Sequence, residues 1–68
     1  MTASTDLALL SSIAAQIDEL AARVTDMAER YGRTPDSSVA SELFGAERSL
    51  LASRRQIDRA RSTLGESV

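Results

Sequence analysis

The segment Tyr31-Gly32-Arg33-Thr34-Pro35-Asp36 decides the fold, because it is the one stretch that interrupts an otherwise helical pattern. Gly32 follows the last periodic residue before the break, where a glycine in the left-handed conformation commonly ends a helix. Thr34 is suited to cap the next helix, and Pro35 suits its first position, where the missing N–H costs nothing. Asp36 then lies near the positive end of the helix dipole. The segment therefore predicts two helices joined as an αα-hairpin.

The whole chain of 68 residues is expected to be one small all-α domain. Its predicted parts are a flexible N-terminus (1–5), a first helix (about 6–31), a turn (32–34), a second helix (about 35–64) and a flexible C-terminus (65–68). Ser4, Thr5 and Asp6 are each able to cap the start of the first helix.

Both halves of the chain carry a heptad repeat, the spacing with which helices pack in a coiled coil. In the first helix, sizeable apolar side chains fill every a and d position: Leu10, Ile13, Ile17, Leu20, Val24, Met27 and Tyr31. An adjacent stripe at e reads Leu7, Ala14, Ala21 and Ala28. The second helix is large at a (Leu43, Leu50, Ile57, Leu64) and, after Val39, small at d (Ala46, Ser53, Ala60). Large positions facing small ones favour close packing between the two helices.

The charge distribution favours an antiparallel arrangement of the two helices. Residues 1–31 hold five acids and two arginines, whereas residues 48–61 hold five arginines and one acid. Folding the chain back on itself brings these opposite charges together, with Asp18 expected beside Arg48. Exposed ion pairs contribute only about 0–1 kcal/mol each to stability, so we expect them to set the orientation of the helices more than the stability of the hairpin.

The apolar side chains exceed what one hairpin is able to bury. Phe44 and Leu51 lie outside the a and d positions, and Ala14, Ala21 and Ala28 widen the apolar arc of the first helix. A chain of this length without disulfide or metal is at the lower limit of what a single core can stabilise. We therefore expect the hairpin, an antiparallel α-helical coiled coil, to complete a four-helix bundle by dimerisation, with these five residues as the association surface. Alternatively, Phe44 and Leu51 are ordinary exposed apolar side chains.

The composition excludes most catalytic chemistry. The chain has no Cys, no His and no Lys, so the usual thiol nucleophiles, general bases, Schiff-base amines and zinc ligands are missing. Its acids fall on solvated helix faces, without the burial that an acid–base pair needs. We therefore expect no catalytic residue, no cofactor and no metal, and a protein that is not an enzyme.

Arginines gather toward the end of the second helix: Arg48, Arg54, Arg55, Arg59 and Arg61. A guanidinium group binds phosphate or carboxylate in bidentate fashion, which makes this cluster a candidate contact for an anion or an acidic partner. Alternatively, the cluster only neutralises the acidic first helix. The formal net charge of −2 and the lack of interleaved aromatic residues argue against nucleic acid as the ligand.

The sequence favours a small non-catalytic protein–protein interaction module: a scaffold, adaptor or regulatory subunit that acts by self-association or by docking an apolar helix face. Its expected partner is a second copy of itself or another helical protein. The alternative is an arginine-dependent nucleic-acid or nucleotide-binding regulator built on a dimeric hairpin. The longest apolar run, Leu7-Ala8-Leu9-Leu10, is far shorter than the ~20 residues of a membrane span. We therefore expect a cytoplasmic protein that has no membrane span.

Overall fold

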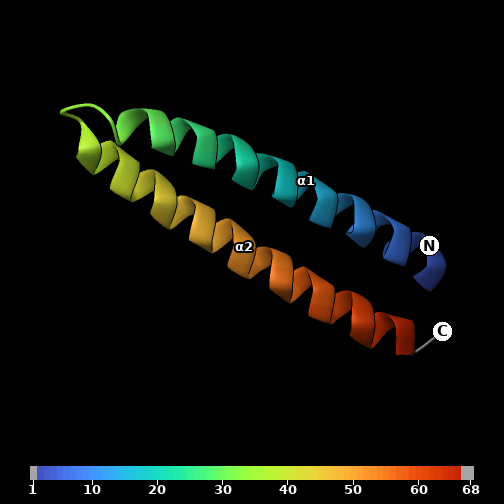
Figure 1. Ribbon diagram of the computed structural model, residues 1–68. Coiled ribbons are helices and arrows are strands. Elements are labelled where there is room, and N and C mark those ends of the chain that lie inside the picture. The colour runs from blue at the N-terminus through green and yellow to red at the C-terminus, as the bar shows by residue number, and fades with distance from the viewer. Residues whose placement is uncertain (1, 67–68) are drawn as a thin grey trace.

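The computed structural model describes residues 2–66, which form two antiparallel α-helices, α1 (Ala3–Tyr31) and α2 (Ser37–Glu66) (Figure 1). The two helices lie side by side along a rod that measures 52 × 14 × 13 Å. The turn is at one end of the rod, and the start of α1 and the end of α2 are together at the other (Figure 1). The all-α hairpin predicted from the sequence is thereby confirmed.

Both helices extend further toward the ends of the chain than the sequence predicted. Thr2 caps α1, because its hydroxyl accepts a hydrogen bond from the backbone N–H of Thr5 at 3.2 Å. Residues 3–5, expected to be flexible, are therefore helical. At the other end α2 continues to Glu66. Met1 and the last two residues of the predicted flexible C-terminus lie outside the described residues.

The turn does not use the left-handed glycine that was expected at Gly32. Its φ of −62° and ψ of −18° are right-handed helical values, and no described residue has a positive φ. The reason is that the chain continues past α1 as a tightening helical turn. The N–H of Gly32 bonds to the carbonyl of Ala28 at 2.9 Å, and the N–H of Arg33 bonds to the carbonyl of Arg30 at 3.3 Å. Such bonds satisfy carbonyls at the helix end without a left-handed residue.

Thr34 holds the turn together by bonding to the residues on both sides of it. Its hydroxyl donates to the carbonyl of Tyr31 at 2.7 Å and accepts from the N–H of Asp36 at 3.2 Å. The second helix accordingly begins at Ser37, two residues after the predicted start. A hydroxyl bonded back to the preceding helix is the physical reason for this later start.

The two helices meet along alanine side chains. Ala14, Ala21 and Ala28 of α1 and Ala40 of α2 are the buried apolar residues among those described, each no more than 4% exposed. The three α1 residues are seven apart and form one line along the helix, which we call the alanine seam. Because alanine ends at Cβ, the backbones of the two helices can approach closely along this line. The core of the hairpin thus consists of methyl groups.

The large a and d side chains of α1 are not at the centre of the hairpin, contrary to the sequence prediction. The a residues Leu10, Ile17 and Val24 are half-buried at the edge of the contact, and the d residues are 40–45% exposed. The helix is rotated so that the alanine seam faces α2 and the larger side chains lie to one side. The polar contacts described next form between the two helices in this orientation.

Candidate interaction surface

Polar contacts fix how α1 and α2 meet. Residues spaced by seven on α1 contact residues spaced by seven on α2, in the pairs Ser11–Arg61, Asp18–Arg54 and Thr25–Glu47. In each pair the two residue numbers add to 72. This sum gives the register of the antiparallel helices: two residues whose numbers add to 72 lie at the same height along the rod, or level with each other. The same register brings the Cβ of Ala40 to 3.9 Å from where a Cβ on Gly32 would lie. Asp18 therefore pairs with Arg54, which is six residues further along α2 than the predicted partner, Arg48.

Arg54 is the most connected polar side chain of the hairpin. Its Nε and Nη2 donate to the two carboxylate oxygens of Asp18, each at 3.2 Å, and its Nη1 donates to Asp58 on its own helix. Asp58 also accepts from Arg61 at 3.2 Å. The hydrogen bonds that Arg54 donates to Asp18 are the main reason why the pKa of Arg54 is raised above its ordinary value. This network holds one side of the alanine seam.

The five arginines of the predicted cluster differ in their partners. Arg54 donates hydrogen bonds to two acids, as described above. Arg61 donates to Asp58 and to Ser11, and Arg59 donates to Gln56 at 2.6 Å. Arg48 and Arg55 are exposed and form no ion pair within residues 2–66. Three of the five guanidinium groups are therefore already bonded within the hairpin, and those of Arg48 and Arg55 are exposed.

The predicted association surface is divided by the structure. Ala14, Ala21 and Ala28 are buried between α1 and α2, each no more than 4% exposed, so they do not lie on the outer surface of the hairpin. Phe44 is half-buried and Leu51 is 37% exposed. In the register of the polar contacts, these two residues are level with Ala28 and Ala21, where large side chains on α2 face small ones on α1. Phe44 and Leu51 thus border the hairpin's own contact.

A different apolar surface runs along both helices. In an antiparallel pair, a residue four positions before one that faces the other helix lies on the same side of the pair, whichever helix it belongs to. On α1 this side carries the large a and d residues: Leu10, Ile13, Ile17, Leu20, Val24 and Met27. On α2 it carries Val39, Leu43, Ala46, Leu50, Ile57, Ala60 and Leu64, interrupted by Ser53. We call this surface the apolar face; it lies opposite the side that carries Asp18 and Phe44.

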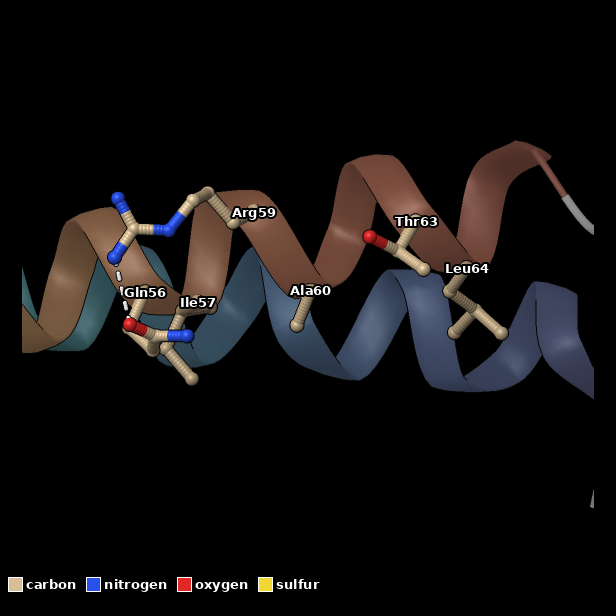
Figure 2. A pocket seen from close by; sticks show the side chains of 6 residues that line it. All are labelled: Gln56, Ile57, Arg59, Ala60, Thr63 and Leu64. Carbon is tan, nitrogen blue, oxygen red and sulfur yellow. Dashed lines mark hydrogen bonds between the residues drawn. The ribbon is translucent and has the colours of Figure 1, made fainter.

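The apolar face is open and grooved. One open groove on α1 is lined by Leu20, Val24 and Met27, with Arg23 at its edge. A second groove follows the end of α2. Figure 2 shows its lining residues, with Ile57, Ala60 and Leu64 along one side of the helix and Gln56, Arg59 and Thr63 around them. The grooves show where an additional side chain from another molecule would find apolar neighbours, and they mark the polar edges of the face.

The hairpin exposes more surface than a compact protein of its size. Its accessible surface is 4789 Å², whereas a compact monomer of 7.3 kDa is expected to expose about 4,200 Å². The excess of about 600 Å² is of the same order as the ~800 Å² that each partner loses in a standard interface. The rod-shaped hairpin therefore exposes enough surface for a contact of ordinary size.

Within residues 2–66, no three acidic side chains gather in a way that could hold a metal ion. Neither helix of that range combines the length and apolar character needed to cross a membrane. Comparison of the chain with protein-family models, with curated proteins and with solved structures finds no match. The apolar face is thus the feature on which a functional proposal can be built.

Proposed function

We propose that the protein is a non-catalytic helical interaction module, a scaffold, adaptor or regulatory subunit, that docks its apolar face on another helical surface. The observation that carries this proposal is the contrast between the two sides of α1. The fully buried apolar side chains of the hairpin are alanines, while the large side chains at Ile13, Leu20 and Met27 remain 40–45% exposed.

The energetics favour an occupied apolar face. Full burial of a Leu, Ile, Val or Met side chain contributes about 1.5–3 kcal/mol relative to full exposure. A side chain that is already half-buried, such as Leu20, therefore has on the order of 1 kcal/mol still to gain. The face carries many such side chains, whereas the four buried alanines contribute little to the hairpin. Contact with a second helical surface would bury the residues that give a small helical protein most of its stability.

The proposal is tested by measuring circular dichroism and sedimentation equilibrium on the same samples across a concentration series, with a hydrophobic dye as a third readout. We expect either helix content and melting temperature that rise with protein concentration, or a poorly helical monomer that binds the dye. The first result means that copies of the chain cover the face, and the second that another protein does. A fully helical monomer that melts cooperatively, independently of concentration and without dye binding would overturn the proposal.

A matched pair of variants locates the surface. Leu20→Asp places a charge in the apolar face, whereas Glu19→Asp, at the neighbouring exposed position, leaves the face unchanged. Loss of the concentration dependence or of dye binding in Leu20→Asp alone would support docking through this face. Equal behaviour of the two variants would contradict it.

A further inference from the structure

We infer that the apolar face binds a second copy of this chain, with the two-fold axis parallel to the helices and both turns at the same end of a four-helix bundle. This inference rests on the proposed function and names its partner. Three observations carry it: the accessible surface in excess of a compact monomer, the sizes of the side chains on the two halves of the face, and the charges at its two edges.

Side-chain size distinguishes the two ways in which a two-fold axis can bring the faces together. The outer row of the face is large on α1 (Ile13, Leu20, Met27) and small on α2 (Ala46, Ser53, Ala60). In the register of the polar contacts, each large residue is within one residue of being level with a small one: Ile13 with Ala60, Leu20 with Ser53, and Met27 with Ala46. The two rows are therefore complementary at equal height along the rod.

An axis parallel to the helices uses this complementarity. It places α1 of one copy over α2 of the other without a change of height, so Leu20 lies against Ser53 of the second copy. An axis perpendicular to the helices instead places α1 over α1 and α2 over α2. Leu20 would then lie against Leu20 of the second copy, and Ser53 against Ser53. Large residues would crowd on one side and leave a gap on the other, both of which destabilise a packed core.

The edges of the face carry opposite charges at the same height. Arg23 borders the groove on α1, and Arg30 is one heptad further along the same edge. Gln56 and Thr63 border the groove on α2, and Glu42 occupies their heptad position near the turn. Arg30 and Glu42 are level in the register and exposed. The parallel axis brings Arg30 of each copy to Glu42 of the other, whereas the perpendicular axis moves Arg30 toward the start of the other α1.

Disulfide trapping tests both the partner and the axis, because the chain has no cysteine of its own. Leu20→Cys and Ser53→Cys chains are oxidised separately and as an equal mixture. We expect the mixture to shift from 7.3 kDa to twice that mass as a mixed disulfide, while either variant alone remains largely uncrosslinked. Ala52→Cys, one residue from Ser53 and exposed on the outside, is the matched control and should not crosslink with Leu20→Cys.

The other outcomes separate this inference from the proposed function. Efficient self-crosslinking of Ser53→Cys would overturn the parallel axis, although the face would still be an interface. A chain that sediments as a monomer at every concentration would overturn the second copy as partner. In that case, dye binding and low helix content would still support docking to a different protein.

A charge exchange provides an independent test of the axis. Arg30→Glu or Glu42→Arg alone should weaken dimerisation by about 30-fold or more, because each replaces two symmetry-related attractive pairs, worth about 1 kcal/mol each at most, with two repulsive ones. The double variant should recover the affinity, since it restores opposite charges at both edges. A double variant as weak as the single ones would overturn the parallel axis.

Discussion

Replacing Ala21 with leucine should unfold the hairpin more readily, because Ala21 faces α2 in the middle of the alanine seam. Its side chain is 4% exposed, so no solvent-filled space surrounds its Cβ. Leucine adds three carbon atoms at a place where the helices approach closely. Alanine and leucine have similar helix propensities, so the result reports on packing and not on the intrinsic stability of α1.

The expected magnitude follows from the cost of overpacking a close contact. Extra methylene groups in a well-packed core cost typically about 1–3 kcal/mol. For a domain of this size, each kcal/mol lowers Tm by about 4–8 °C. A cost of about 2 kcal/mol therefore lowers Tm by about 8–16 °C.

Thermal and urea unfolding followed by circular dichroism measure this change. Ala22→Leu is the control, because Ala22 is the next residue of the same helix and is exposed. The Ala22 variant should unfold close to the original chain. If Ala21→Leu were as stable as Ala22→Leu, or more stable than the original chain, the alanine seam would not be the contact between the two helices.

Smaller effects are expected at other positions. Gly45→Ala should raise the free energy of unfolding by about 1 kcal/mol, because its new Cβ would meet only the Arg48 guanidinium, at 3.7 Å. Gly32→Ala should leave the stability unchanged or raise it by up to about 1 kcal/mol, since φ is right-handed and the nearest atom to a Cβ would be at 3.4 Å. Asp18→Asn should cost no more than about 1 kcal/mol, and the difference should vanish in 1 M salt, which screens the pair with Arg54.

The urea midpoint of each variant, compared with that of the original chain, checks these three predictions. A lower midpoint for Gly45→Ala would mean that another helix approaches Gly45. A loss above 1 kcal/mol for Gly32→Ala would indicate a left-handed turn. An Asp18→Asn deficit that persists in 1 M salt would mean that the carboxylate contributes through more than its charge.

The sequence was sufficient for the architecture of the fold but not for the rotation of its helices. The break at residues 31–36 and the heptads on both sides of it predict two antiparallel helices, and the structure contains them. On α1, however, two neighbouring heptad positions are apolar, one large and one small. Hydrophobic periodicity alone favours the large residues as the contact, whereas the structure buries the alanines. The heptad of Ser11, Asp18 and Thr25 was the overlooked signal, because these side chains match polar partners on α2.

The rotation of the helices also decides where the candidate site residues lie. With the large residues assigned to the hairpin, the alanines became candidates for the association surface, and Arg54 remained a candidate anion contact. Once Arg54 is matched with Asp18, the alanines lie inside the hairpin and Arg54 is paired within it. Pairing by heptad position across the turn, judged by charge and hydrogen-bonding capacity as well as by size, would have favoured the observed register. The left-handed Gly32 was a further wrong prediction, because composition does not reveal how a turn satisfies its carbonyls.

The alanine seam also predicts how this chain tolerates mutation. Positions 14, 21 and 28 face the neighbouring helix and should accept only very small residues, whatever the partner of the apolar face is. Positions 13, 20 and 27 should accept a range of large apolar residues and reject charged ones only where the partner is present. Saturation mutagenesis scored once for folding and once for association should therefore show two seven-residue periodicities of sensitive positions, offset by one residue. Substitutions at positions 13, 20 and 27 would then change the preferred partner, while positions 14, 21 and 28 keep the hairpin intact.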